Sequence, residues 1–130
     1  MINVESILKV ADNSGAILVK CIKLFKFSYR IGAIPSQTIL VVVRKNIFKK
    51  HVTKKSKIII KGRIYKALIL RSIKGLKRWG NFYIKCYHNL VILLNEYNLP
   101  FATRLYGPIV REIRMKSKYS KIISLAEFIL

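Results

Sequence analysis

The side chains that could support catalysis in this sequence are few, and several stand together in one short stretch, VADNSGA, at residues 10–16. Asp12, Asn13 and Ser14 offer a carboxylate, an amide and a hydroxyl side by side. Hydrolytic chemistry would need a general base near a nucleophile, or two carboxylates with separated pKa values. No histidine is near in sequence. Asp, Asn, Ser and Gly together are typical of a tight connection between strands, so we interpret the stretch as a turn and not as an active site.

The remaining metal-ligating and nucleophilic side chains are scattered. Cys21 and Cys86 stand far apart without a CxxC pair, and neither His51 nor His88 has a partner at ligand spacing. No glycine-rich loop has the pattern that cradles a phosphate. The sequence therefore predicts no metal site, no cofactor and no catalytic residue, and we expect two free thiols in a reducing compartment.

The charge balance is the unusual feature of the composition. Lysine and arginine number 26 against five acids, which gives a formal net charge of +21. Such an excess repels itself in a compact chain and favours a polyanionic partner, most often nucleic acid. An anionic membrane is the alternative, but the apolar runs at 39–43 and 90–94 are too short to span a bilayer, and the first residues do not resemble a signal peptide. We predict a soluble protein bound to nucleic acid, with no membrane partner.

Period-two alternation and short apolar runs predict a mainly β fold that closes as a small barrel. Strands are expected at 6–10, 16–25, 38–44, 58–60, 65–73, 82–87 and 90–94, with a basic loop at 46–57 and a hairpin tip at 74–81. After Pro100 the pattern changes, and Pro108 favours a short helix at 109–115. A last helical turn is expected within 117–130. The chain reads as one domain over 1–130, with the barrel at about 1–99 and a helical part at about 100–130.

Basic residues gather in segments that could contact RNA. The first segment holds Arg44, Lys45, Lys49, Lys50, Lys54, Lys55 and Lys57, and the second holds Arg71, Lys74, Lys77, Arg78 and Lys85. Trp79, Phe82 and Tyr83 interleave with the second, either as packing residues or as platforms for unpaired bases. Two such runs on one barrel fit phosphate contacts with some base stacking. A third cluster follows residue 103, where we expect Glu112 to form a local ion pair with its neighbouring arginines.

Several motifs together identify a family resemblance. VADNSGA, KCIK at 20–23, ATRLYGPIVREIR at 102–114 and KIISLA at 121–126 resemble the universal large-subunit ribosomal protein number fourteen, in matching order and spacing. The resemblance implies a five-stranded β-barrel with short C-terminal helices. It also implies a structural, non-enzymatic constituent of the large subunit, bound to large-subunit rRNA at the face that meets the small subunit. The loop around 46–57 looks longer than in the family.

The resemblance further implies partners. These are ribosomal proteins number three and number nineteen, small-subunit rRNA across an inter-subunit bridge, and a ribosome-silencing factor on a surface that matches Thr103, Arg104 and Lys121. The match begins at Met1, which leaves no room for a removable import sequence, and the composition resembles that of an AT-rich genome. We therefore expect a protein made in an organelle and working in the mitochondrial matrix, with a plastid or a bacterial cytoplasm as alternatives.

Two other functional classes would also suit parts of this sequence. A free RNA-binding barrel, such as a chaperone or a translation factor, would be equally basic but would exchange with the soluble pool. An RNA-modifying enzyme would need a cofactor loop or an acid–base constellation, and the sequence has neither.

Overall fold

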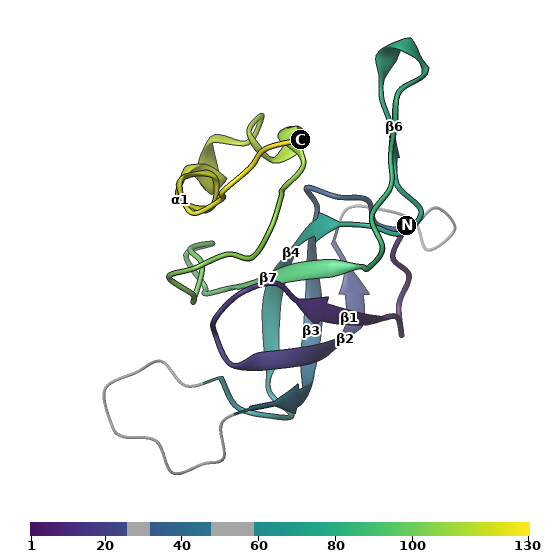
Figure 1. The fold of residues 1–130 in the computed structure, drawn as a ribbon. Coiled ribbons are helices and arrows are strands. Elements are labelled where there is room, and N and C mark those ends of the chain that lie inside the picture. The colour runs from purple at the N-terminus through teal and green to yellow at the C-terminus, as the bar shows by residue number, and fades with distance from the viewer. Residues whose placement is uncertain (26–31, 48–58) are drawn as a thin grey trace.

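The structure is a computed structural model that describes residues 1–25, 32–47 and 59–130 (Figure 1). The strands are β1 Ile7–Val10, β2 Ala16–Leu24, β3 Thr38–Asn46, β4 Ile64–Arg71, β5 Leu76–Lys77, β6 Tyr83–Ile84 and β7 Leu90–Leu94. The helical elements are the 3₁₀ turns η1 Trp79–Asn81, η2 Arg111–Ile113 and η3 Ser117–Tyr119, and the short helix α1 Ser120–Ser124. The predicted mainly β class is confirmed.

Five strands close into a barrel in the order β1–β2–β3–β4–β7. Neighbouring strands are antiparallel except β1 and β7, whose parallel pairing completes the ring. A closed ring leaves no unpaired strand edge, so its backbone donors and acceptors are satisfied internally. The predicted five-stranded barrel is therefore confirmed, and each of its strands begins and ends within two residues of the expected range.

Two of the expected strands do not belong to the barrel. Ile59 and Ile60 lie outside every strand, and Ile58 lies outside the described residues. Ile59 is nevertheless buried in the barrel core, and the Asn46 side chain donates a hydrogen bond to its carbonyl oxygen. An apolar residue here fills the core without joining the ladder. The strand expected at 82–87 shortens to β6, which pairs only with β5.

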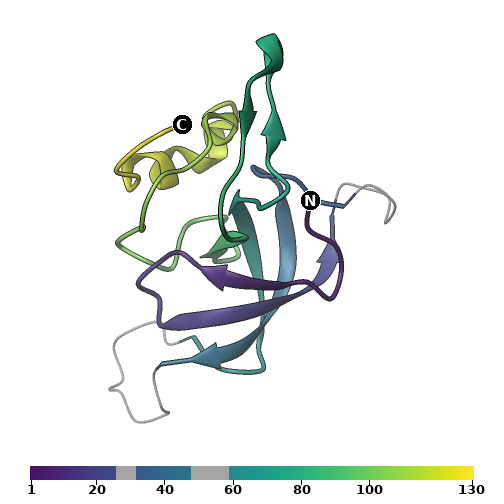
Figure 2. The same cartoon turned by 45° about the vertical axis from the view of Figure 1, so that its right-hand side comes forward.

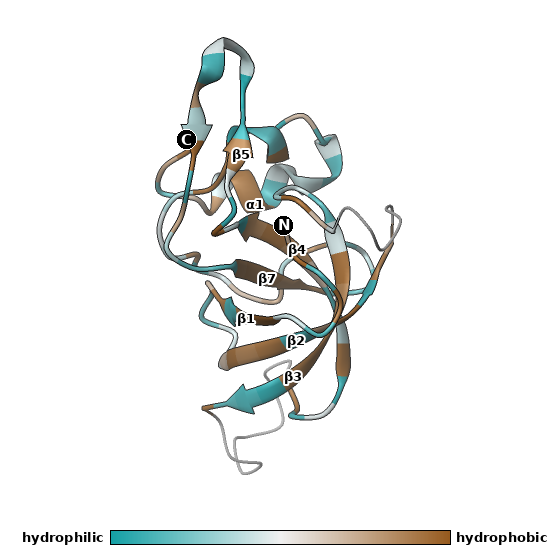
Figure 3. Ribbon diagram, turned by 90° about the vertical axis from the view of Figure 1, so that its right-hand side faces the viewer, coloured by the Kyte–Doolittle hydropathy of each residue, from teal (hydrophilic) through white to brown (hydrophobic). Residues whose placement is uncertain are grey.

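The two faces of β4 and β7 explain their continuous apolar sequences. Ala67 and Ile69 point into the barrel with Val91 and Leu93 of the neighbouring strand. The alternate residues Leu68, Leu70, Ile92 and Leu94 belong to a second buried cluster outside it. Because successive side chains of a strand face opposite ways, a run buried on both faces needs a cover on each. Figure 3 shows the hydrophobic colour along both strands.

The C-terminal part supplies that outer cover. Leu105, Ile109, Ile113, Tyr119 and Ile122 pack in the second cluster with the outer side chains of β4 and β7. The predicted helix at 109–115 is wrong in extent, because only η2, over residues 111–113, is helical. Ile109 instead pairs in parallel with Ile129, accepting a backbone hydrogen bond from Leu130 at 2.8 Å. The expected last helical turn within 117–130 is present as η3 and α1.

A hairpin formed by β5 and β6 projects away from the barrel, with η1 at its tip, as Figure 2 shows. Its base needs glycine at position 75. A side chain there would lie 2.5 Å from the carbonyl oxygen of Ile84, and the φ angle of +78° is one that other residues rarely adopt. The predicted hairpin tip at 74–81 falls within this hairpin but is too long, because β5 lies inside that range and only η1 forms the tip. In the described part of the chain, no helix has the length and apolar character needed to cross a membrane.

Candidate nucleic-acid interface

The stretch VADNSGA forms the connection between β1 and β2, as the sequence predicted. Asp12 is buried, and its two carboxylate oxygens accept hydrogen bonds from the backbone N–H groups of Ser14 at 2.8 Å and of Leu93 at 3.2 Å. Burial raises the pKa of Asp12, although these hydrogen bonds act in the opposite direction. Both oxygens are committed to backbone donors, which is a structural and not a catalytic use of a carboxylate.

The neighbouring Asn13 holds a second part of the chain. Its amide NH₂ donates to the Thr103 hydroxyl at 3.0 Å, and its amide oxygen accepts the backbone N–H groups of Thr103 and Arg104, both at 3.1 Å. The backbone adds to this contact, since Tyr106 N–H donates to the Ala11 carbonyl at 2.8 Å. A turn at residues 11–15 therefore fixes the backbone of the Thr-Arg pair about ninety positions later. Sequence reasoning identified the turn but not this clamp, which no local signal reveals.

The three residues of the expected subunit-facing surface are all exposed. Thr103 and Arg104 lie on the segment held by Asn13, and Lys121 lies on α1. Leu105 and Ile122, each adjacent in sequence to one of these residues, pack in the same buried cluster. The fold thus anchors both segments on one core while leaving the three polar side chains in solvent.

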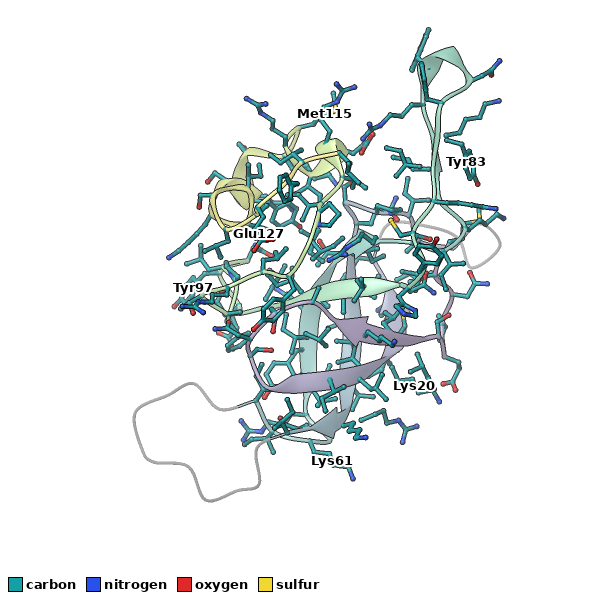
Figure 4. All side chains as sticks on the ribbon, in the orientation of Figure 1. Lys20, Lys61, Tyr83, Tyr97, Met115 and Glu127 are labelled. Atoms are coloured by element: carbon teal, nitrogen blue, oxygen red, sulfur yellow. The ribbon has the colours of Figure 1, made fainter. Side chains whose placement is uncertain are left out.

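Only part of the first basic segment falls within the described residues. Arg44 and Lys45 are exposed near the end of β3. Lys49, Lys50, Lys54, Lys55 and Lys57 lie outside the described residues. Lys61, which Figure 4 labels, and Arg63 are further exposed cations in the connection that leads into β4. Within the described residues, the start of this segment is therefore exposed and basic, and so is the chain that follows it at Lys61 and Arg63.

The second basic segment divides into two groups. Lys74, Lys77 and Lys85 are exposed on the hairpin and its base. Arg71 is partly buried, its guanidinium donates to the Tyr106 carbonyl, and burial lowers its pKa. The same guanidinium lies over Gly107, where a side chain would meet it at 3.0 Å. Arg71 therefore has a packing role beside the Gly-Pro turn that the sequence alone did not reveal.

Arg78 also has an intramolecular role. Its guanidinium forms two hydrogen bonds with the Glu112 carboxylate, at 2.6 and 3.0 Å, and one with the Leu130 carbonyl oxygen at 2.7 Å. The prediction of a local ion pair for Glu112 is wrong, because its partner lies 34 residues earlier, on the hairpin. Partial burial acts to raise the pKa of Glu112, but the hydrogen bonds and the charges of Arg78 and Arg111 outweigh it and lower that pKa.

This ion pair closes one side of a groove of about 900 Å³ between the hairpin and η2. Trp79, Phe82 and Tyr83 line the hairpin wall and Met115 lines the other; Figure 4 labels Tyr83 and Met115. Trp79 is 99 % exposed and Phe82 is 71 % exposed. Trp79 and Phe82 are therefore not buried, whereas Tyr83 packs on the hairpin base, where its hydroxyl donates to the Lys74 carbonyl oxygen.

The structure offers little support for other kinds of site. Cys21 is buried and Cys86 half-buried, both as free thiols. Among the residues of 1–25, 32–47 and 59–130, no three His, Cys, Asp or Glu side chains gather in a way that could hold a metal ion.

Comparison with known proteins agrees with this architecture. The family model of ribosomal protein L14p/L23e matches residues 1–130. The large ribosomal subunit protein uL14m of Acanthamoeba castellanii is 56 % identical over 127 residues, which cover 98 % of each chain. The protein of the same name in Acanthamoeba polyphaga is 57 % identical over 114 residues, covering 88 % of this chain and 97 % of that one. These are structural proteins and not enzymes. With its barrel, its ADNSGA turn and a match along its full length, the chain belongs to the ribosomal protein L14p/L23e family.

Proposed function

We propose that this protein binds large-subunit rRNA through its exposed basic side chains. We also propose that the exposed surface of Thr103 and Arg104, the Thr-Arg corner, contributes to a bridge with the small subunit. Family membership already makes it a structural constituent of the large ribosomal subunit, and the relatives named uL14m make that ribosome the mitochondrial one. What we propose beyond this is which surface of the protein contacts which partner.

The charge of the chain supports a contact with rRNA. Five carboxylates cannot neutralise 26 cationic side chains, so most of these cations need an external anion when the chain is folded. Each phosphate that they neutralise releases condensed counterions, which gives an affinity that depends strongly on salt. Such contacts fix the position of the protein on folded rRNA but read little base sequence.

The exposed cations are the best candidates for these contacts. They are Arg44 and Lys45 near the end of β3, and Lys74, Lys77 and Lys85 on the hairpin and its base. Arg71 and Arg78 have a supporting role in this proposal, since their guanidinium groups already bind Tyr106, Glu112 and Leu130. The lysines at positions 49, 50, 54, 55 and 57 remain predicted contacts. The exposed rings of Trp79 and Phe82 are suited to stacking on unpaired bases.

The Thr-Arg corner is a distinct surface. In Figures 1 and 2 the hairpin projects from one side of the molecule, and the loop after β7 that leads to this corner lies on the other. The observation that carries the bridge proposal is the clamp of Asn13, which holds the backbone of Thr103 and Arg104 while their side chains stay exposed. A fixed backbone that presents exposed polar side chains is suited to recognition, because little conformational freedom is lost on docking.

Further partners follow from the resemblance alone. Ribosomal proteins number three and number nineteen, small-subunit rRNA and a ribosome-silencing factor are proposed neighbours, the last on the surface of Thr103, Arg104 and Lys121.

The proposal is tested by sedimentation of lysates through sucrose gradients at low and at raised salt. One variant combines Lys74→Gln, Lys77→Gln and Lys85→Gln, and the other combines Thr103→Ala with Arg104→Ala. The hairpin variant should leave the large-subunit fractions as salt rises, since three phosphate contacts are lost. The corner variant should stay with the large subunit but reduce intact ribosomes. Release of the unaltered chain at raised salt would instead identify a free RNA-binding barrel.

A further inference from the structure

A second, smaller pocket lies on the molecule away from the hairpin groove. It has a volume of about 330 Å³ and is formed where the end of β2, the start of β3, β4, the loop after β7 and η3 meet. Its lining residues are Phe25, Gln37, Thr38, Lys66, Asn98, Lys116, Lys118 and Tyr119. None of them is among the predicted rRNA contacts at 44–57 and 71–85.

The charges around this pocket all have one sign. Lys66, Lys116 and Lys118 all line it, and none of its described lining residues carries a carboxylate. Like charges gathered around a concave surface repel each other and raise the local positive potential. An anion in the pocket would relieve this repulsion.

Two of the three lysines are held in place. The Lys116 ammonium donates to the carbonyl oxygen of Ser36 and lies 3.4 Å from its hydroxyl oxygen. The Lys118 ammonium lies 5.2 Å from the centre of the Tyr119 ring, which is a cation–π distance. Fixed cations lose less side-chain freedom when they bind an anion than mobile ones do.

The pocket also has uncharged hydrogen-bond donors. The hydroxyl oxygens of Thr38 and Tyr119 lie 2.6 Å apart and share one hydrogen, so one hydroxyl hydrogen of the pair remains for another acceptor. The amide oxygen of Gln37 accepts the Ile34 N–H at 3.3 Å, which leaves its NH₂ group as a donor. Ammonium, hydroxyl and amide donors together suit the several acceptor oxygens of a phosphate group.

We propose that this pocket binds a phosphate group and that, in the ribosome, the group is a phosphodiester of rRNA. The inference rests on the proposed rRNA binding and extends it to a surface that includes no residue of the hairpin. The half-exposed Phe25 ring at the rim is suited to contact the adjoining nucleotide. The pocket would thus fix one point of the RNA backbone against the seam between the barrel and its C-terminal cover.

The test is an NMR titration of the isotope-labelled full chain with inorganic phosphate, against chloride at matched ionic strength. The amide signals of Thr38 and Tyr119 should shift together along one saturable curve. Lys66→Gln should weaken this binding about tenfold, as expected for one lost charge-assisted hydrogen bond. Lys61→Gln is the matched control, since it removes the same charge from an exposed site in the same part of the chain and should leave the curve unchanged. Equal weakening by both variants, or no saturable shift in the pocket, would overturn the site.

A second titration separates the two sources of phosphate. A mixed-sequence RNA duplex should shift the same pocket signals and prevent added inorganic phosphate from shifting them further. If RNA shifts only the hairpin signals while phosphate still fills the pocket, the assignment to rRNA is wrong. Failure of the pocket remains distinguishable from failure of the proposed function, because the hairpin variant in the sucrose gradient tests the latter without involving Lys66.

Discussion

The clamp formed by Asn13 gives the sharpest prediction about this protein. Asn13→Ala removes three hydrogen bonds, of 3.0 to 3.1 Å, to the hydroxyl and backbone of Thr103 and to the backbone of Arg104. A net contribution of about 0.5 to 1.5 kcal/mol applies to each such bond. Because Asn13 is exposed and water replaces part of what is lost, we expect a total near the lower end, about 1.5 kcal/mol.

That free energy corresponds to about a tenfold change in the local opening equilibrium. Amide hydrogen exchange measured by NMR should therefore be about tenfold faster at Thr103 and Arg104. Exchange at Val91 in the barrel should not change, because the Tyr106–Ala11 backbone hydrogen bond and the barrel ladder remain. In the gradient, the variant should stay with the large subunit while fewer intact ribosomes form.

Two further variants make this reasoning refutable. Asn13→Asp keeps an acceptor for both backbone N–H groups and should restore slow exchange. Asn3→Ala removes the same side chain from another exposed position and should leave exchange at Thr103 unchanged. Unchanged exchange in Asn13→Ala, or an equal increase in Asn3→Ala, would refute the clamp. Faster exchange with normal subunit joining would refute only its role in the bridge.

Three other outcomes follow from the structure. The folded-state pKa of Glu112 is lowered, so its ion pair with Arg78 stabilises the fold above the unfolded carboxyl pKa of about 4.3. This stability is lost as pH falls, because the carboxylate becomes protonated. The thermal unfolding temperature should therefore depend less on pH below about 5 in Glu112→Gln than in the unaltered chain. Burial raises the pKa of Cys21 to about 11, so mass spectrometry after alkylation at neutral pH should find label on the half-buried Cys86 alone, with both thiols labelled in denaturant. Gly107→Ala places a side chain at a φ of +74° and 3.0 Å from the Arg71 guanidinium, so urea denaturation should show a loss of free energy of unfolding above the backbone strain of about 1 to 2 kcal/mol. Gly62→Ala, which also has positive φ but open space around it, should show that strain alone.

The barrel was predictable because its signals are local. Period-two alternation in β2 and β3 places Val19, Cys21 and Val41 inside, and the Asp-Asn-Ser-Gly turn needs only its own residues to form. The family motifs, which lie in separate segments of the chain, could be matched without knowing how these segments meet. Fold class and family were therefore available from the sequence.

The predictions made from the sequence were wrong where a residue's partner lies far away in the chain. The sequence from 109 to 115 begins like a helix, but Ile109 pairs with Ile129, and this pairing outweighs its local preference. The isoleucines at 58–60 resemble a strand, yet Ile59 fills the core without ladder partners. Burial and pairing over long distances release more free energy than the small differences in local propensity.

The charged residues show most clearly what the sequence determines and what only the tertiary structure decides. Composition alone determined the large positive net charge, from which a polyanionic partner was predicted, since net charge is a sum that does not depend on the fold. Only the tertiary structure decided which cations remain available for it, because Arg78 binds Glu112 while Lys77 stays exposed one position away. Likewise, the chemistry of the Asn13 side chain follows from the sequence, but only the folded chain brings Thr103 within reach of its amide. Hydrogen bonds and ion pairs form over about 3 Å, and the fold alone decides which residues lie that close.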